Sequence, residues 1–329
     1  MTTARKDASV ARVARSTPAA ADSTHIDEAE FRGLYTRLRE GAAHGGTDRL
    51  GALNNLTPDH RLAALREVHE GRSVSLAAPM ETARAADNPS PCQHTLAGAA
   101  AGVPDTEGLD FAFDSVTFNV HGNADSHIDA LCHVVYDGTL YNGVSADRRT
   151  SDDAAALSID TVHDGIVGRG VLLDIPRLRG VQWLEPGDYV SYDELVRAEQ
   201  DQGTPVGTGD MLFVRVGHRR RRHELGPWDA ATSRAGLHPR AMLFAAERHI
   251  AVLGSDSNSD TAPSLTPAVD FPVHVLAIHA MGLQLLDYLQ LDDLAAMCAD
   301  RGSWGFLCVI APLRLPAATG SPVNPIALL

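Results

Sequence analysis

The segment His121-Gly-Asn-Ala-Asp-Ser-His127-Ile-Asp129-Ala-Leu-Cys-His133 places three imidazoles and two carboxylates within 13 positions of the chain. It follows an apolar, β-prone run at 111–120. Imidazole and carboxylate groups are ligands that zinc and manganese accept, and imidazole also carries protons near neutral pH. Some clustering by chance is expected among 15 histidines, but buried ionisable groups are costly unless they are paired or coordinated. The segment therefore predicts a metal or acid–base site at the end of a buried strand.

The spacing within this segment indicates which side chains share one side of the backbone. Alternate residues of a strand point to the same face, so His127 and Asp129 form the expected ligand pair. His133 is expected to lie beside the metal and to carry a proton, first as a base and then as an acid. If the strand extends further back, three more polar side chains share its ligand face: His121, Asn123 and Asp125.

Beyond this segment, helical and strand patterns follow one another without strict alternation and without an internal repeat. Periodic apolar residues and capping signals predict helices at 24–41, 57–71, 192–200, 239–249, 272–282 and 292–299. Short apolar runs predict strands at 73–77, 170–175, 211–216, 250–254, 283–289 and 306–311. This order predicts a mixed α/β or α+β fold with a largely antiparallel sheet.

Local signals add detail to two of these helices. Thr24 is expected to cap the first helix. Leu62, Leu65 and Val68, together with Ala64, are expected to form the buried stripe of the second helix.

Several polar or aromatic segments are predicted to lie outside regular structure or away from the site. The proline-rich segment 87–94 is expected to be an irregular loop long enough to cover a site. The four arginines at 219–222 are expected to form a solvated loop, with a local anion or subunit contact as the alternative. Asp256 and Asp260 follow a buried strand, where a simple turn and a role in the site are both open. Three large aromatic residues are expected to pack in the core or at its rim: Trp183, Trp228 and Tyr288.

The composition limits the classes of partner. The formal net charge of −14 argues against nucleic acid and anionic membranes. The sequence has no apolar run long enough to span a bilayer and no secretory leader pattern. Residues 1–23 predict a disordered tail, although a transit peptide has a similar composition. The four cysteines are far apart and show no CxxC pairing, which favours reduced thiols and a cytoplasmic location.

The histidine segment also resembles the signature of a known family. Ser126, His127, Asp129 and His133 fit the pattern His-x-x-(Thr/Ser)-His-x-Asp-x-x-x-His of the cyclase family, which includes bacterial kynurenine formamidase, isatin hydrolase and enzymes named polyketide cyclases. Other short segments match the longer branch of this family in the same order along the chain: 51–54 with 57–58, 88–91 with 94, 141–143, 254–256, 272–274 and 320–325.

This resemblance implies a single β/α/β swivelling-type domain at 24–329, assembled as a homodimer or homotetramer. It also implies a site for one or two divalent ions, mainly zinc or manganese, with a second cluster formed by a histidine at a helix start and a glutamate shortly after. His274 falls at the histidine position and Asp287 at the glutamate position. On one continuous helix the two side chains would lie about 220° apart, so we expect Gly282 to break the helix between them.

Two residues depart from the family pattern. Asn123 stands where the family has its first histidine ligand, and an amide is a poor zinc ligand. His121 can replace it only if the backbone bends at Gly122. Asp287 has a shorter reach than glutamate. Two possibilities therefore stay open: a mononuclear site with one weak ligand, or a site that has lost its metal.

These residues predict an enzyme with a small-molecule substrate. The first hypothesis is a metal-dependent hydrolase of a small cyclic amide, lactone or N-formyl compound, in which His127 and Asp129 hold the metal and His133 moves the proton. The second is a cyclase or dehydratase of a biosynthetic pathway that uses His133 and Asp129 with little or no metal. The third is a non-catalytic binding protein. Residues 84–100 are expected to shape the substrate pocket.

Overall fold

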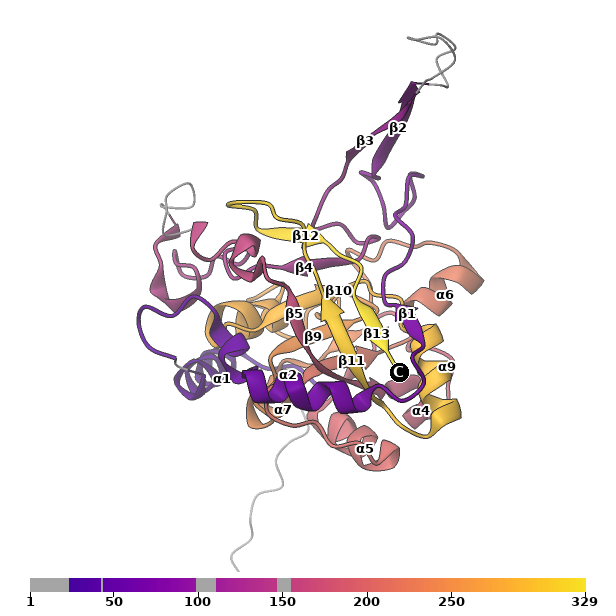
Figure 1. The fold of residues 1–329 in the computed structure, drawn as a ribbon. Coiled ribbons are helices and arrows are strands. Elements are labelled where there is room, and N and C mark those ends of the chain that lie inside the picture. The colour runs from indigo at the N-terminus through magenta and orange to yellow at the C-terminus, as the bar shows by residue number, and fades with distance from the viewer. Residues whose placement is uncertain (1–23, 43, 99–110, 147–154) are drawn as a thin grey trace, which may run out of the picture.

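The apolar runs predicted as strands all lie in one large sheet, most of them in its interior and the run at 73–77 at its edge (Figure 1). The structure is a computed structural model that describes residues 24–42, 44–98, 111–146 and 155–329. Within these residues nine strands pair in the order β1-β13-β11-β5-β7-β9-β10-β4-β12. In the same order their bounds are Ser73–Ser75, Ile326–Leu328, Gly305–Ile310, Ile166–Asp174, Met211–Arg215, Val252–Ser255, Gln284–Asp287, His127–Asp129 and Gly320–Pro322. The tail predicted for residues 1–23 lies outside the described residues.

The sheet is parallel in its centre and antiparallel on both flanks. Strands β5, β7, β9 and β10 pair in parallel, and the other neighbouring pairs are antiparallel. Parallel neighbours need crossover connections, which this chain supplies as helices. Strands covered on both faces read as continuous apolar runs, and every residue of β7, β9 and β10 is buried. The predicted mixed, largely antiparallel α/β fold is confirmed.

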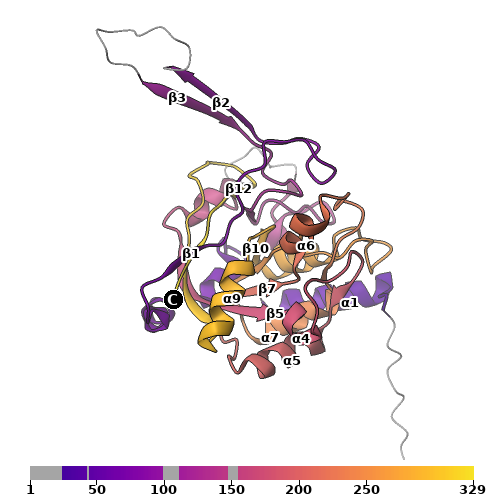
Figure 2. The same cartoon turned by 90° about the vertical axis from the view of Figure 1, so that its right-hand side faces the viewer.

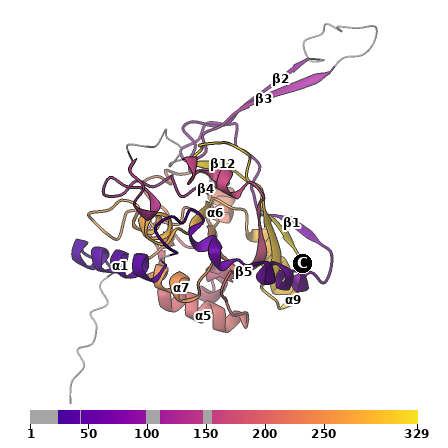
Figure 3. The same ribbon diagram turned by 60° about the vertical axis from the view of Figure 1, so that its left-hand side comes forward.

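The helices cover the sheet and complete one continuous hydrophobic core. Helices α4, α5 and α7 gather on one side of the sheet (Figure 2), and Figure 3 shows α5 and α7 there from another direction. The α-helices of the described chain are α1 Glu28–Gly41, α2 Pro58–Ala64, α4 Ile175–Arg179, α5 Tyr192–Gln202, α6 His218–Leu225, α7 Met242–Glu247, α8 Pro272–His274 and α9 Asp292–Arg301. None of these helices combines the length and the apolar composition that a membrane crossing requires.

Two details of the predicted helices are wrong. Asp27, not Thr24, caps α1, because its side chain accepts a hydrogen bond from the backbone of Glu30 at 2.8 Å. Helix α2 is followed by a 3-10 turn, and Leu62 and Leu65 are exposed while Ala64 is buried. Leu65 and Val68 lie beyond the end of α2 and do not continue its 3.6-residue period, so the predicted stripe does not form and Ala64 is the buried residue of the helix.

The four-arginine run is helical, which corrects the prediction of a solvated loop. It lies in α6, where Arg219 is buried and donates to the backbone carbonyl of Ala124 at 2.6 Å. Arg222 forms ion pairs with Asp87, the first residue of the predicted loop 87–94, and with Glu81 just before the loop. Paired and hydrogen-bonded guanidinium groups can be buried, and this helix uses them to fasten the loop to the domain.

The largest error concerns the β-prone run at 111–120, which was predicted as a buried strand. Strand β3 (Ala112–Thr117) is exposed along its whole length and pairs with β2 (Gln93–Gly98), so regular structure already begins within the predicted loop 87–94. The two strands form a hairpin that projects from the body of the domain (Figures 1 and 2). We call this hairpin the arm. A second small sheet pairs Tyr189–Val190 with Gly236–Leu237.

Candidate metal centre

The ligand pair predicted at the centre of the signature lies on one short strand. Strand β4 presents His127 and Asp129 to the same side, with 3.7 Å between His127 Nε2 and Asp129 Oδ1. Both side chains are buried. The strand has only three residues, so it does not include His121, Asn123 and Asp125, and the alternation of faces along a strand does not decide where their side chains point. These three residues lie in the turn and bend that precede β4.

His121 nevertheless lies at the site. Its Nδ1 is 2.9 Å from Asp129 Oδ1, and its Nε2 is 2.9 Å from the hydroxyl oxygen of Thr319. A turn at 120–121 and a bend at 123–125 flank Gly122 and supply the change of direction that this placement requires. Edge strand β12 also makes room for it, because a Cβ at Gly320 would come within 2.8 Å of His121 Cε1 and 2.5 Å of the Ile128 carbonyl oxygen.

His133 returns to the site through a tight turn after β4, closed by a hydrogen bond from its backbone to the Ala130 carbonyl. Its ring stacks on that of His121 with 3.8 Å between the ring centroids. Burial lowers the pKa of His133 to about 4, and the negative charge of Asp129 opposes this only in part. The imidazole of His133 is therefore neutral at pH 7 and has a lone pair that can accept a proton.

The second predicted cluster also reaches the site. Strand β10 runs antiparallel to β4 with Asp287 opposite His127. His274 ends the short helix α8, a π-helical turn follows at Val275–Ala280, and Gly282, with a positive φ of 65°, ends the helical segment before β10. His274 Nε2 lies 3.5 Å from Asp287 Oδ2. The break expected at Gly282 is confirmed, and Asp287 reaches the cluster despite its short side chain.

Asp129 is at the centre of the cluster and has an unsatisfied atom. Its Oδ2 is buried and accepts no hydrogen bond within the described part of the chain, while His274 Nε2 lies 3.4 Å away. Burial alone would raise the pKa of Asp129, but His133, His121 and the other imidazoles hold it well below its usual value. An ionised, buried carboxylate oxygen without a hydrogen bond is costly unless a cation satisfies it.

The donor atoms therefore fit a divalent metal ion. Two groups of three residues each bring their ligand atoms within 4.8 Å of one another: His121, Asp129 and His133 in one, and His127, Asp129 and Asp287 in the other. Asp129 belongs to both groups. Burial alone would lower the pKa of His274, but the nearby carboxylates, Asp129 and Asp260 foremost, raise it well above its usual value. This surplus of negative charge around one imidazole also favours a cation.

Groups around the cluster fix the orientation of two imidazoles. His127 Nδ1 is 2.9 Å from the Asp125 carbonyl oxygen, so it donates there and its Nε2 carries the lone pair that faces Asp129. His274 Nδ1 donates to Asp260 Oδ2 at 2.6 Å, which leaves Nε2 facing the cluster. Histidines that bind metals commonly donate their second nitrogen to a carbonyl or carboxylate in this way.

The buried polar loop after β9 holds the second cluster. Asp260 accepts hydrogen bonds from the backbone of Val273 and His274 as well as from the His274 ring. Asp287 accepts from Asn258 Nδ2 at 2.7 Å and from the Ser259 hydroxyl at 2.8 Å. From the sequence, both a simple turn and a role in the site were open for Asp260. In the structure its carboxylate contacts His274. The signal was its position at the carboxyl end of a central parallel strand, where sites in α/β sheets tend to lie.

Asn123 is placed differently from the four histidines. Its Oδ1 accepts a hydrogen bond from the Tyr288 hydroxyl at 3.0 Å. Tyr288 is buried, as expected, but it also contacts the site, with its ring 6.2 Å from that of His127. It follows Asp287 directly and has a positive φ of 57°, which is unusual for a bulky residue and turns its side chain toward Asn123.

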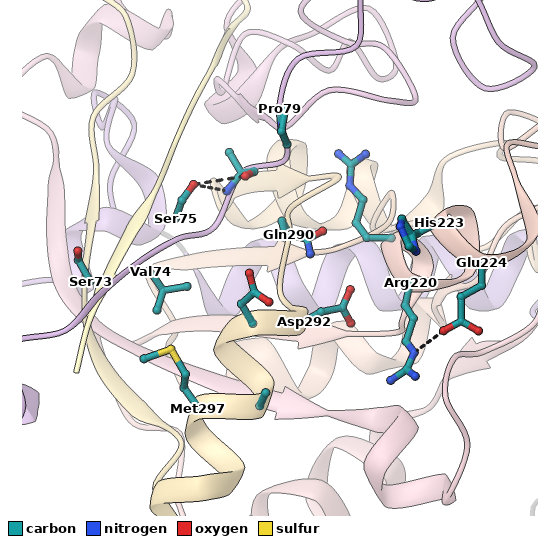
Figure 4. A pocket seen from close by; sticks show the side chains of 14 residues that line it. Ser73, Val74, Ser75, Pro79, Arg220, His223, Glu224, Gln290, Asp292 and Met297 are labelled. Atoms are coloured by element: carbon teal, nitrogen blue, oxygen red, sulfur yellow. Dashed lines mark hydrogen bonds and ion pairs between the residues drawn. The ribbon is translucent and has the colours of Figure 1, made fainter.

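A separate open hollow of about 1040 Å³ lies between β1, α6 and α9 (Figure 4). Among the described residues, none that lines this hollow belongs to the His–Asp cluster. Arg220 is one of its lining residues and pairs with Glu224 at 2.9 Å, as Figure 4 shows. Because this charge is satisfied within the lining, we assign the hollow no role in the chemistry.

Comparison with known proteins places this cluster in a family. The sequence profile of the family described as "Putative cyclase" matches residues 65–260, which is more than half of the chain. No curated protein matches the sequence. The chain resembles a solved structure described as a novel cyclase, with 29% identity and a TM-score of 0.80, over 90% of this chain and 99% of the other.

Two isatin hydrolases share the fold at lower identity. Isatin hydrolase A from Labrenzia aggregata, bound to benzyl benzoate, is 18% identical with a TM-score of 0.55, over 78% of this chain and 93% of the other. An isatin hydrolase bound to the product analogue thioisatinate is 18% identical with a TM-score of 0.53, over 83% and 99%. The protein belongs to the cyclase family and is an enzyme of the cyclase or hydrolase type.

Proposed function

We propose that this enzyme is a metal-dependent hydrolase of a small cyclic amide, lactone or N-formyl compound. The observation that carries the proposal is the unsatisfied Oδ2 of Asp129, buried among four imidazoles and a second carboxylate. The similarity to isatin hydrolases supports the fold on which this chemistry is proposed.

The residues that would hold a zinc or manganese ion are His127, Asp129 and Asp287, with His274 beside them. His121 can complete a shell on the other side of Asp129. A bound divalent ion supplies a Lewis acid that polarises a carbonyl and makes a water molecule more acidic. The burial of these side chains excludes bulk water and so strengthens the electrostatic interactions within the site.

His133 is the proposed proton carrier. Its neutral imidazole accepts a proton from the attacking water and returns it to the leaving nitrogen or oxygen. The stacked ring of His121 fixes the plane of the His133 ring, and Asp129 supplies negative charge that stabilises the protonated form. His133 can instead serve as a ligand with His121 and Asp129, and the two roles make different predictions for its alanine variant.

The test is chelation followed by addition of metal. We expect dialysis against a chelator to abolish hydrolysis across a panel of cyclic amides, lactones and N-formyl amines, and stoichiometric zinc or manganese to restore it. A chelated protein that hydrolyses these compounds at the original rate contradicts the proposal.

A second candidate is a cyclase or dehydratase that works with little or no metal, and Asn123 is the observation that favours it. Its amide oxygen is occupied by the Tyr288 hydroxyl. The variant Asn123→His separates the two candidates. If His121 already completes the shell, metal affinity should stay unchanged in this variant. Clearly tighter binding in the variant would indicate an incomplete wild-type site and favour the second candidate.

We also propose a cytoplasmic location and no nucleic-acid or membrane partner. The four cysteines are free and buried, which fits a reducing compartment. The net charge of −14 opposes binding to polyanions. Separation of cytoplasmic and membrane fractions of the native host, with detection of the protein in each, tests this proposal. Recovery in the membrane fraction contradicts it.

A further inference from the structure

Three arginine side chains are buried in the described chain, and they differ in what balances their charge. Arg215 forms ion pairs with Asp174 at 2.8 Å and with Asp292 at 2.7 Å. Arg219 and Arg234 form no ion pair with any described residue. Arg219 borders the open hollow between β1, α6 and α9, where solvent lies next to it. Arg234 is only 2% exposed, and a buried charge is costly unless an opposite charge balances it.

The guanidinium group of Arg234 is held in place by neutral groups alone. Its Nε donates to the Asp260 carbonyl at 2.9 Å, and its Nη1 donates to the carbonyls of Ala230 at 2.9 Å and Ala231 at 2.8 Å. Its third nitrogen, Nη2, donates no hydrogen bond to a described residue. Arginine carries five N–H donors in a fixed fork, so the donors of Nη2 and the positive charge remain for another group.

Arg234 lies next to the cluster of candidate ligands. Its Cζ is 5.3 Å from the centroid of the Phe271 ring, and the same centroid is 5.7 Å from that of the His274 ring. Asp260, whose carbonyl accepts a hydrogen bond from Arg234, also holds the His274 ring through its carboxylate. Phe271 is 46% exposed. The guanidinium of Arg234 and the imidazole of His274 are therefore within reach of one small molecule.

A second path of aromatic contacts leads from the cluster back to Arg234. The ring centroid of Tyr288 is 6.2 Å from that of His127 and 5.3 Å from that of His218. The centroid of His218 is 4.7 Å from that of Trp228, whose Nε1 donates at 2.6 Å to the carbonyl of the residue before Arg234. Together the two paths form a closed circuit of contacts, with aromatic rings and one positive charge beside the cluster.

His218 adds a second polar group without a partner to this circuit. Its Nε2 is buried and has no hydrogen-bond partner among the described residues. Burial lowers the pKa of His218 well below its usual value, and the positive charges of Arg219, Arg222 and Arg234 lower it further. The ring is therefore neutral at pH 7, and its Nε2 is free to form one hydrogen bond with a ligand. Buried polar groups are rarely left without a partner, so this nitrogen also indicates a ligand.

We propose that the substrate is an aromatic compound with a carboxylate, and that Arg234 binds this carboxylate and so determines specificity. The inference rests on the proposed function, because the reacting carbonyl is placed at the cluster. A carboxylate supplies the single negative charge that Arg234 lacks and accepts hydrogen bonds from Nη2. A phosphate would bring a second negative charge that no described residue balances. Phe271 and Tyr288 offer ring surfaces to the aromatic part of the substrate.

The first test compares the hydrolysis of N-formylaniline with that of its ortho, meta and para carboxylates by the metal-loaded enzyme. At least one carboxylate should have a KM at least about tenfold lower than that of N-formylaniline, a usual gain from a hydrogen bond between charged groups. The kcat should differ less, because the carboxylate is bound equally well in the ground state and in the transition state.

Three variants assign the preference to Arg234. In Arg234→Gln the KM values of the neutral and acidic compounds should become equal, and a comparison of two substrates on one protein is not affected by a general loss of activity. Arg220→Gln is the control, because it makes the same change in net charge at an exposed arginine of α6 and should keep the wild-type ratio. Arg234→Lys keeps the positive charge and should keep part of the preference, which separates lost charge from a disturbed fold.

A second measurement needs no turnover. Titration of the three aminobenzoates, followed in the NMR spectrum of the ligand, should show at least one that binds wild type at least about tenfold more tightly than aniline does. Arg234→Gln should lose this advantage. Binding of an aminobenzoate through Arg234 without hydrolysis of any N-formyl compound would support this inference and count against the proposed function.

Two results would overturn the inference. One is a wild type that hydrolyses N-formylaniline as efficiently as every carboxylate, which would leave the proposed function standing. The other is a preference for the carboxylate that persists in folded Arg234→Gln, which would place the carboxylate elsewhere.

Discussion

Two His–Asp pairs of this chain lie in opposite surroundings. On the arm, His94 Nε2 and Asp114 Oδ1 are 2.5 Å apart, with side chains 48% and 53% exposed. At the site, His121 and Asp129 are 2.9 Å apart, and Asp129 is 1% exposed. Water screens the first pair, whereas the second is surrounded by three further imidazoles and a carboxylate. The same residue types therefore form a surface contact in one place and a candidate metal centre in the other.

The difference shows that a His–Asp pair does not by itself identify a site. Burial of the pair and the presence of further imidazole or carboxylate groups beside it do. Asp114 is exposed to solvent, but the second oxygen of Asp129 is buried and accepts no hydrogen bond from the described residues. Variants of the exposed pair on the arm can therefore serve as matched controls for variants of the buried pair at the site.

The variants His127→Ala and Asp129→Ala should have the largest effect. Each removes a donor from the centre of the cluster, so we expect hydrolysis to fall to background while the apo protein keeps its circular dichroism spectrum. The matched variants His94→Ala and Asp114→Ala on the arm should leave the rate unchanged. Equal losses in both pairs would indicate a general structural effect and would remove the distinction between them.

The variant His133→Ala should lower turnover by roughly 10²–10⁴-fold, the usual size of general acid–base catalysis. Its metal content should match wild type, because the proposed role of this residue is proton transfer. Steady-state kinetics and elemental analysis of the same preparation measure the two quantities. Loss of metal in this variant would make His133 a ligand.

The variant Asp260→Asn should weaken metal binding or activity by about 10–100-fold, the usual cost of removing a group that orients a metal-binding histidine. The Asp260 carboxylate accepts a hydrogen bond from His274 Nδ1 at 2.6 Å. The neutral side-chain amide of the asparagine variant lacks the negative charge that strengthens this hydrogen bond. Asp270→Asn is the control, since Asp270 is exposed in the same part of the chain. The readout is the metal dissociation constant, with the thermal unfolding of the apo proteins compared to exclude a merely structural effect.

The variant Asp114→Asn should have the smallest effect. Exposed ion pairs contribute about 0–1 kcal/mol, so the free energy of unfolding in urea should change by no more than that. A loss of several kcal/mol would show that the arm pair is not screened by water in solution.

The sequence predicted the centre of the site because its signal is local. His127 and Asp129 are two residues apart on a strand, and this spacing alone puts them on one side. The resemblance to the cyclase family added His274 and Asp287, which no local pattern connects. The buried central strands could also be predicted, because strands covered on both faces appear as apolar runs.

The remaining features depend on tertiary partners that a local pattern does not contain. The run at 111–120 has the composition of a core strand, but in the described chain β3 pairs only with β2 and stays exposed. Arg219 is predicted from the sequence to lie at the surface, but it is buried in the structure. Its burial is possible because the backbone carbonyls of Leu289 and Ala124 accept hydrogen bonds from its guanidinium group. The role of Asp260 became visible only when the fold brought it to His274.

The central claim is that the Asp129 carboxylate is the middle of a metal centre, and calorimetric titration of zinc and manganese onto the apo protein tests it most directly. We predict at least one ion bound per chain by wild type and by Asp114→Asn. In the Asp129→Asn variant, which keeps the size of the side chain and removes its charge, the same titration should show binding weakened by at least about tenfold. Equal binding by Asp129→Asn, or no binding by wild type, would contradict the account.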